Sequence, residues 1–227
     1  MSENENHFSM MPKSFLETDL NTSEIGFIAL LSYLSEPSTR LANTRALYGQ
    51  NGDYFVDALG VNDDNSIYRW HKIIKTMLEK LSQAKIISVT SNGLTFDLHI
   101  PTTSKYGFAK LYYSSVANIL RTYNGDLALK YLAVYAVIKS KIFSNKQSKN
   151  VLVVSQESLA GEIGISVPTL RRYMKQLQAI KAISMSKIKS QNGKSMRIVV
   201  ADKHDEGDLN RYVSRQLTGG ETVKFDY

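Results

Sequence analysis

Two helices joined by a tight turn are predicted by the stretch Val154-Ser-Gln-Glu-Ser-Leu-Ala-Gly-Glu-Ile-Gly-Ile-Ser-Val-Pro-Thr-Leu-Arg-Arg-Tyr-Met-Lys-Gln-Leu177. Ser155 and Ser166 stand where a side-chain oxygen can cap the first turn of each helix. Gly164 can adopt the left-handed conformation that ends the first helix, and Pro168 falls in the first turn of the second, where its missing N–H costs nothing. This layout is typical of proteins that place their second helix in the major groove of DNA.

Positive charge is concentrated around this stretch. Residues 101–200 hold sixteen Lys and Arg against three acids, a net charge of +13 in a chain whose total is +7. Residues 1–100 are acidic, with eight basic and twelve acidic side chains, and so are residues 201–227, with four and six. A pI near 9.4 favours polyanionic partners. DNA-binding, ribosomal and membrane-surface proteins share such a pI, so charge alone does not choose among them.

The composition excludes several classes of protein. The chain has no cysteine, which removes thiol nucleophiles, disulfides and thiolate zinc sites and fits a reducing cytosol. The amino-terminal segment Met-Ser-Glu-Asn-Glu-Asn is polar and acidic, unlike a secretion signal, and no apolar run approaches the about 18 residues of a membrane span. We therefore expect a soluble cytoplasmic protein with no membrane partner.

The chain contains an internal repeat. Shifting the sequence by 104 positions aligns its halves without a gap over some fifty residues, so that Ile25 falls on Leu129 and Leu59-Gly60-Val61 falls on Ile163-Gly164-Ile165. At an offset of 100, Asn92-Gly93 meets Asn192-Gly193 between runs rich in strand-forming residues, and this dipeptide favours a hairpin turn.

Each half is therefore predicted to contain a helix, a shorter helix, a turn, a long helix and a two-stranded wing. In the first half Asn21 and Glu24 form a capping-box pattern before a helix, a polar connection spans 36–53, and helices near 54–59 and 66–84 precede strands at 86–89 and 94–100. In the second half, Asp126 is a candidate cap, and strands are expected at 183–188 and 195–200.

The predicted fold is α+β, mainly helical, with two tandem winged helix-turn-helix domains. We expect a first domain over 8–101, a second over 108–201, each with its own core, and a polar C-terminal tail over 202–227, in which Leu209, Tyr212, Val213 and Leu217 have the spacing of one amphipathic helix.

The second half holds the main candidates for DNA contact. A helix end in the major groove needs small residues where the backbone approaches bases, a methyl group for thymine and guanidinium groups for guanine. Thr169, Arg171 and Arg172 suit these tasks, and we expect Ser166, Val167 and Lys175 beside them on the same helix. Phosphate contacts are predicted for helix-start residues Ser155 and Gln156 and for wing residues Lys187, Lys189, Lys194 and Arg197. The alternative is that these side chains form only a solvated helix face.

The first half has the same frame with less favourable charge. Its long helix offers Ser66, Tyr68, Arg69 and Lys72, but Asp63-Asp64 precedes it and Asp97 lies in its wing. Carboxylates repel a phosphate backbone, so we expect a dimerisation or partner surface with auxiliary DNA contacts. Trp70, at an inward helical position, is expected in the core.

No enzymatic site is predicted. The four histidines are scattered without the spacing of a helical metal site, and no phosphate-binding Gly-rich loop or Gly-x-Ser-x-Gly motif is present. Asp57, Asp63 and Asp64 are a candidate divalent-ion cluster, but capping explains acids at a helix start equally well. We expect no cofactor, no metal and no catalytic residue.

The chain resembles the tandem winged-helix proteins of mobile elements, especially plasmid replication initiators of the two-winged-helix class. The resemblance is carried by Phe8-Ser-Met-Met-Pro-Lys-Ser-Phe-Leu16, Leu20-Asn-Thr-Ser-Glu-Ile25 and the stretch from Ser155 to Leu177, and it covers about residues 8–200. It implies a first domain that mediates homodimerisation or secondary contacts, a second that binds repeated origin sites, and partners in the replication machinery.

Other interpretations stay open on the sequence alone. The motif from Leu159 to Leu177 also looks like the helix-turn-helix of bacterial repressors, which implies an operator and the transcription machinery instead. A protein-interaction module would use the winged helices as docking platforms and would show no sequence preference. One scaffold serves all these roles.

Overall fold

The computed structural model describes residues 7–91, 93–102, 107–142, 150–189, 196–218 and 222–224. They form an α+β protein in which helices and small antiparallel sheets alternate along the chain. None of the described helices is long and apolar enough to cross a membrane.

The first half begins with a strand and a short 3-10 helix, followed by three helices and a four-stranded sheet. Its elements are β1 (Phe8–Pro12), η2 (Lys13–Glu17), α1 (Thr22–Leu34), β2 (Glu36–Pro37), β3 (Thr44–Gln50), α2 (Gly52–Ala58), α3 (Asp64–Gln83), β4 (Ser88–Ser91) and β5 (Phe96–Pro101). The antiparallel sheet has the strand order β2-β3-β5-β4.

The second half follows the same plan and adds a C-terminal helix and strand. Its elements are β6 (Phe108–Tyr112), α4 (Tyr113–Thr122), α5 (Gly125–Ile142), β7 (Leu152–Ser155), α6 (Gln156–Ile163), α7 (Val167–Ala179), β8 (Ile183–Lys189), β9 (Met196–Asp202), η3 (Lys203–Asp205), α8 (Glu206–Thr218) and β10 (Thr222–Lys224). Its antiparallel sheet has the order β10-β8-β9-β7.

The two halves repeat one another in structure as well as in sequence. The offset of 104 places Gly52 on Gln156, and these are the first residues of α2 and α6. In each half the strand just before the short helix pairs with the last strand of the hairpin, β3 before α2 with β5 and β7 before α6 with β9. The long helices α3 and α7 both end before a lysine with positive φ, 57° at Lys85 and 59° at Lys181, where the next N–H bonds back to a leucine carbonyl.

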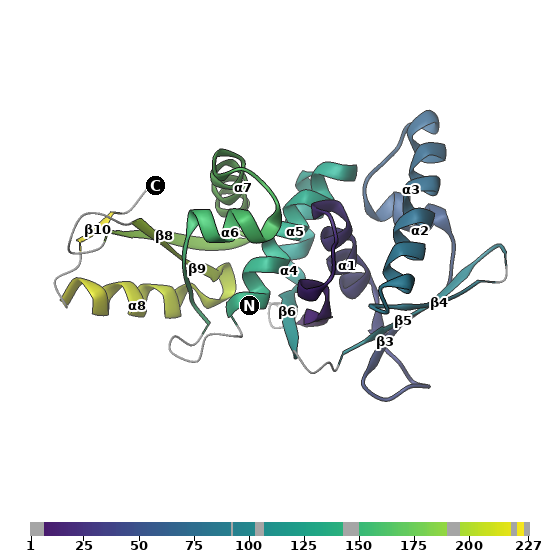
Figure 1. The fold of residues 1–227 in the computed structure, drawn as a ribbon, viewed down its shortest axis with the longest axis horizontal. Helices are drawn as coiled ribbons and strands as arrows, with labels where there is room; N and C mark the ends of the chain where they lie inside the picture. Colours follow the sequence, from purple (N-terminus) through teal and green to yellow (C-terminus); the bar gives the residue numbers. More distant parts are fainter. Residues whose placement is uncertain are drawn as a thin grey trace.

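The halves meet where α1 packs along α5 in the middle of the molecule (Figure 1). A Cβ atom on Gly26 would lie 1.9 Å from the carbonyl oxygen of Leu129, so the two backbones are in contact at this point. Glycine is therefore required at position 26 by close approach rather than by a turn.

Reciprocal contacts surround this crossing. The N–H of Gly125, at the start of α5, donates to the carbonyl of Leu59 after α2 (2.8 Å), and the hydroxyl of Thr22, at the start of α1, donates to the carbonyl of Ile163 at the end of α6 (3.1 Å). The equivalent strands β1 and β6 pair with each other, with Met10 opposite Lys110. Each half thus gives its partner half the same kind of contact, as in a two-fold symmetric interface.

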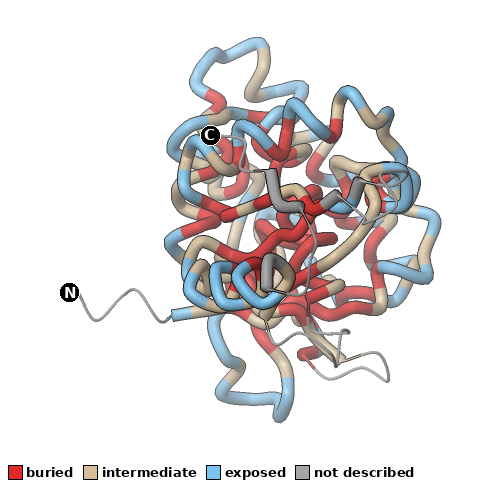
Figure 2. Tube along the Cα trace, turned by 90° about the vertical axis from the view of Figure 1, so that its left-hand side faces the viewer, coloured by how far each residue is buried: buried red, intermediate tan, exposed pale blue. Residues whose placement is uncertain are grey.

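One continuous core fills both halves, although the sequence favoured two separate cores. Buried side chains from β1 through β9 belong to a single cluster, and Figure 2 shows buried segments gathered inside with exposed segments around them. Trp70 belongs to this cluster, 9% exposed, as expected.

Several local predictions are confirmed. Asn21 accepts from the backbone N–H of Glu24 (2.9 Å) and the Glu24 carboxylate accepts from Asn21, which completes the capping box. The wing strands lie within about two residues of their predicted positions. Asp126 is not a cap, because α5 begins at Gly125 and the Asp126 carboxylate instead accepts from Ser23 (2.5 Å) and pairs with Lys130 (2.6 Å).

The predicted polar connection over 36–53 is wrong, because it contains β2 and β3. Ala46 and Leu47 are buried, and so is Arg45, whose guanidinium donates to the Ser35 hydroxyl (3.0 Å), to the Ser35 carbonyl and to the hydroxyl of Tyr113 (3.2 Å). Three consecutive buried residues break the alternation by which a strand is recognised.

A buried charge network ties α5 to the end of β9. The Lys139 side chain, 1% exposed, places its Nζ 3.5 Å from Asp202 Oδ2, 3.7 Å from Asp205 Oδ2 and 4.5 Å from the centre of the Tyr112 ring. Burial, followed by the nearby aspartates, raises the pKa of Tyr112 to about 12, so its ring stays neutral beside the ammonium group.

Asp202 is the centre of this network. Its carboxylate accepts hydrogen bonds from the hydroxyl of Tyr135 (2.5 Å), the hydroxyl of Ser115 (3.2 Å) and the backbone N–H of His204 (2.9 Å). Burial, and then the charge of Asp202, raises the pKa of Tyr135, which therefore remains a donor.

The segment expected as a polar tail contains α8, an amphipathic helix at the predicted place. Leu209 and Val213 are each 3% exposed and pack against Ile188, Val199 and Ala201 of the wing sheet, forming a small cluster separate from the main core.

We predict that Gly26→Ala destabilises the protein by about 3 kcal/mol, because a methyl group would meet the Leu129 backbone, which cannot move without displacing α5. Urea denaturation measures the change. Gly161→Ala is the control, since that helical glycine has open space around it, and this substitution should be neutral or stabilise by up to about 1 kcal/mol. Equal effects of the two substitutions would contradict a backbone contact between α1 and α5.

We predict different effects on stability for substitutions of the two aspartates beside Lys139. Asp202→Asn should cost about 3 kcal/mol at pH 7, because it leaves a buried ammonium without its central partner. Asp205→Asn should leave stability unchanged or raise it at pH 7.

The reason is the sign of the shift at Asp205, where burial raises the pKa above its ordinary 3.8. The folded state therefore favours the protonated carboxyl, and this contribution is complete below pH 3.8 and lost as the pH rises through the raised pKa. Urea midpoints at about pH 3.5 and pH 7 test this, and an Asp205→Asn variant that is less stable than the wild type at pH 7 would show that the Lys139 ion pair outweighs desolvation.

Candidate nucleic-acid interface

The turn between α6 and α7 is built by the residues that the sequence indicated. The Ser155 hydroxyl accepts from the N–H of Ser158 (3.1 Å) and the Ser166 hydroxyl accepts from the N–H of Thr169 (3.3 Å), so each helix start is capped. Gly164 has φ +75° and ends α6 in the left-handed conformation. The direction of α7 relative to α6 follows from these local contacts.

Helix α7 presents a basic side to solvent. Leu170, Met174 and Leu177 are at most 2% exposed and belong to the core, and Tyr173 is buried with them. The side chains that point outward include Arg171, Arg172 and Lys175, all exposed. The helical spacing in the sequence therefore separated these three basic residues from Leu170, Met174 and Leu177 correctly.

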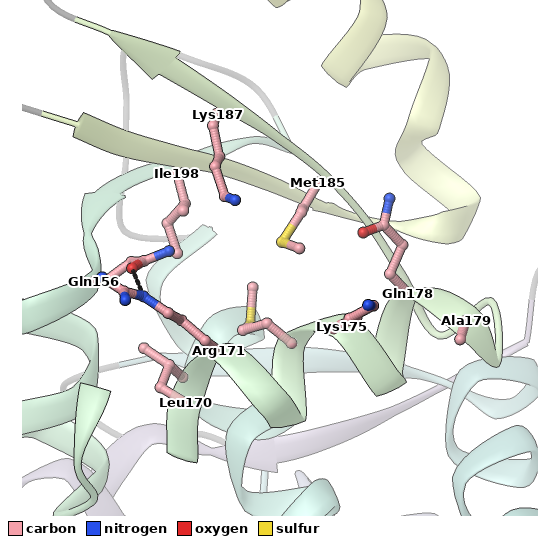
Figure 3. Close-up of a pocket in the computed structure, with 10 residues that line it drawn as sticks. Gln156, Leu170, Arg171, Lys175, Gln178, Ala179, Met185, Lys187 and Ile198 are labelled. Atoms are coloured by element: carbon pink, nitrogen blue, oxygen red, sulfur yellow. Dashed lines mark hydrogen bonds between the residues drawn. The ribbon is translucent and has the colours of Figure 1, made fainter. Parts of the chain in front are cut away.

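A groove of about 630 Å³ runs between α7 and the wing strands β8 and β9 (Figure 3). Its border is polar and basic, formed by Gln156 of α6, Arg171 and Lys175 of α7 and Lys187 of β8. Its apolar lining is formed by Leu170, Met174, Met185 and Ile198. Four predicted contact residues from three elements thus surround one concave surface.

The two arginines of α7 have different surroundings. Arg171 Nε donates to Gln156 Oε1 (2.6 Å), which orients both side chains toward the groove, as Figure 3 shows. Arg172 lies over the Tyr173 ring (5.5 Å to its centre), beside a cluster in which Tyr131 contacts both Tyr173 and Tyr123. Only Arg171 lines the groove.

The amino-terminal residues of α7 are less free than the sequence suggested. Val167, predicted to lie outside the core, is half-buried and packs against it. The Thr169 hydroxyl is within hydrogen-bond distance of the Ser166 hydroxyl (2.8 Å), so both hydroxyls already have a partner.

The wing residues divide between the two faces of the sheet. Lys187 pairs in register with Ile198, and both line the groove. Arg197 is exposed and precedes Ile198, so the alternation of a strand directs it to the opposite face, where its register partner Ile188 packs under α8. Lys189 ends β8, and Lys194 lies outside the described residues.

The corresponding helix of the first half carries mixed charge. Tyr68 is 65% exposed with Lys72 Nζ 4.6 Å from its ring centre, and Arg69 is exposed beside them. Asp63 caps α3 by accepting from the N–H of Ser66 (3.0 Å), and hydrogen bonds with Ser66 lower the pKa of Asp63, which keeps it ionised. The capping role that competed with an ion cluster is therefore the one observed.

Gln178 and Met185 line the groove but were not singled out from the sequence. Their signals are periodic: Gln178 lies seven residues after Arg171, two helical turns along the same side, and Met185 precedes Lys187 by two strand positions. Sequence patterns placed each on a side of its element but did not show that the two sides face one another.

Among the described residues, no three His, Asp or Glu side chains gather as a metal site. Comparison with protein-family models and with curated proteins finds no match to this chain, so the inference about its function rests on the geometry of the α7 groove and on charge.

Proposed function

We propose that the chain is a non-catalytic, sequence-specific protein that binds double-stranded DNA, of the type that initiates replication of plasmids or other mobile elements. The observation that carries this proposal is the groove beside α7. Gln156, Arg171, Lys175 and Lys187 come from three elements, α6, α7 and β8, and they meet on one surface along the capped, basic helix α7. Guanidinium and ammonium groups spaced along such a surface suit base edges and phosphates.

We further propose that each half is a winged-helix domain, with α2–α3 and α6–α7 as the helix-turn-helix pairs. The support is the matching order of the long helices, the short helices and the hairpins in the two halves, and the matching strand pairing β3-β5-β4 and β7-β9-β8, to which β2 and β10 are additions. In this assignment α7 is the principal recognition helix, because α3 is capped by Asp63 and begins with Asp64, and these carboxylates repel a phosphate backbone.

The reciprocal contacts around α1 and α5 suggest how one chain would meet DNA. Helices α3 and α7 lie on the same side of the molecule in Figure 1, and the halves exchange contacts as in a two-fold interface. Two-fold related helices bind half-sites of opposite direction. We therefore propose that one chain contacts two inverted, non-identical half-sites, with Tyr68, Arg69 and Lys72 making the weaker contacts.

A transcriptional repressor is the second candidate, because the same groove would bind an operator. The two functions differ in the arrangement of sites: an initiator binds several direct repeats of its site, whereas a dimeric regulator binds a single palindrome near a promoter. A protein-interaction module predicts no preferred DNA sequence.

We predict that selection from a random duplex library with the purified protein enriches one motif. If the chain neutralises about six to eight phosphates, log affinity should fall with log salt concentration at a slope of about −5 to −7. A slope near −2 would contradict two contacting surfaces. The absence of any enriched motif at two salt concentrations would overturn sequence-specific binding.

We predict that Arg171→Ala weakens binding to the selected DNA site by about 1–3 kcal/mol and relaxes the base preference of the protein. The substitution removes a guanidinium group that can donate hydrogen bonds to guanine. Arg197→Ala is the matched control. It removes an exposed arginine from β9, on the face of the wing sheet away from the groove, and should change the affinity for DNA little. Equal losses on specific and random DNA for Arg171→Ala would show that this residue contacts phosphate rather than a base.

A further inference from the structure

The long helices of the two halves can be matched residue by residue from their C-terminal ends. Helix α3 ends before Lys85 and α7 before Lys181, both with positive φ, and the next N–H in each case donates to a leucine carbonyl, Leu81 or Leu177. These equivalent turns align α3 with α7 at an offset of 96 residues. At this offset α7 begins on His71, and residues 64–70 of α3 have no helical counterpart.

Burial along the two helices supports this match. Buried positions of α3 fall on buried positions of α7: Ile74 on Leu170, Met77 on Tyr173, Leu78 on Met174 and Leu81 on Leu177. Position 80 falls on position 176, and both side chains contact a neighbouring helix. Lys80 Nζ lies 2.8 Å from Glu24 Oε2 of α1, and Gln176 accepts from the Tyr123 hydroxyl at the end of α4 (3.3 Å). Equivalent sides of α3 and α7 therefore face inward.

Two exposed positions in this alignment carry the groove residues of α7. Lys75 falls on Arg171 and Glu79 falls on Lys175, and Arg171 and Lys175 line the groove beside the wing (Figure 3). Helix α3 contacts β4 as α7 contacts β8, so Glu79 occupies the place beside its wing that Lys175 has in the second half. The first position keeps its positive charge, whereas the second has a carboxylate in place of an ammonium group.

The carboxylate of Glu79 is available to a partner outside the chain. Glu79 and Lys75 are exposed, and neither side chain forms a hydrogen bond or an ion pair with another residue that the structure describes. Two other acids next to α3 are engaged, because Asp63 caps the helix and Glu24 binds Lys80. Both oxygens of Glu79 can therefore accept hydrogen bonds from a ligand.

The major groove of DNA offers one base that suits a single carboxylate. Cytosine presents its N4 amino group, which is a donor, whereas guanine presents two acceptors, thymine an acceptor and a methyl group, and adenine a donor beside an acceptor. Acceptors and phosphates repel a carboxylate, so only at cytosine does it gain a hydrogen bond without facing an acceptor of the same base. Lys75, one helical turn earlier, suits the acceptors of guanine.

We propose that Glu79 is a specificity-determining residue of the first half, which accepts a hydrogen bond from the N4 amino group of a cytosine in the half-site that α3 contacts. This inference rests on the proposed function and adds to it a base that distinguishes the two half-sites. The opposite case is a carboxylate that only repels DNA. Repulsion acts on all base sequences alike, whereas the hydrogen bond acts at one base pair.

Glu79→Gln separates these two cases, because it removes the charge and keeps the size of the side chain. Parallel selections from one random duplex library, with the wild-type chain and with the variant, should give motifs that differ at one position, in the half-site that Arg171→Ala leaves unchanged. There the preference for cytosine, measured as the ratio of affinities on four duplexes, should fall by about fivefold, the lower end of what one mismatched base pair costs. Adenine should gain most, because glutamine can pair with its N6 and N7.

Glu17→Gln is the matched control. Glu17 is exposed in η2, outside both helix-turn-helix pairs, and its substitution changes the net charge equally, so every base preference should stay as in the wild type. Both variants should keep the urea midpoint of the wild type, because both side chains are exposed.

Three outcomes would overturn the inference. A Glu79→Gln variant that binds every duplex more tightly by the same factor shows repulsion alone. A change confined to the half-site that also responds to Arg171→Ala shows that Glu79 does not act in a half-site of its own, and an unchanged motif shows that it contacts no base. Each of these leaves the proposed function standing, since the wild type still selects a motif. If the wild type selects no motif, the proposed function itself fails, and this inference fails with it.

Discussion

The arrangement of the whole molecule depends on the backbone contact between α1 and α5 at Gly26. Helix α1 contacts α3, and α5 contacts α6, α7 and the strands β7 and β9, so the crossing of α1 and α5 sets the position of α3 relative to α7. The contact leaves no room for a Cβ atom at position 26, and therefore it admits little sliding of one helix on the other. Two hydrogen bonds, from Gly125 to Leu59 and from Thr22 to Ile163, join the start of each of these helices to the other half and help to fix the crossing.

Local and periodic features of the fold could be predicted from the sequence. The repeat at offset 104 located α2 and α6, and the capping box of Asn21 and Glu24 located the start of α1. Strand β3 was missed because Arg45 is buried by partners that lie ten and sixty-eight residues away, Ser35 and Tyr113, and no local pattern reports such contacts. The single core across both halves likewise depends on packing between segments about a hundred residues apart.

For the candidate site, too, sequence patterns predicted local features but not contacts between elements. Helical spacing was enough to separate the exposed arginines of α7 from its buried leucines, and alternation was enough to find the wing strands. Whether a wing cation faces α7 depends on strand register, and register placed Lys187 in the groove and Arg197 on the other face. The Lys139–Asp202 pair could not be predicted at all, because a buried ammonium group is stabilised only by partners that tertiary folding brings to it.

The pairing of β1 with β6 has a consequence for how the protein forms during synthesis. Phe8–Pro12 leaves the ribosome about a hundred residues before its partner strand, Phe108–Tyr112. At a synthesis rate of about 5–20 residues per second, β1 waits on the order of 5–20 seconds with its backbone groups and Met11 unpaired. During that interval the nascent first half exposes a strand edge and the α1 surface that α5 later covers, and surfaces of both kinds make an incomplete chain prone to aggregate.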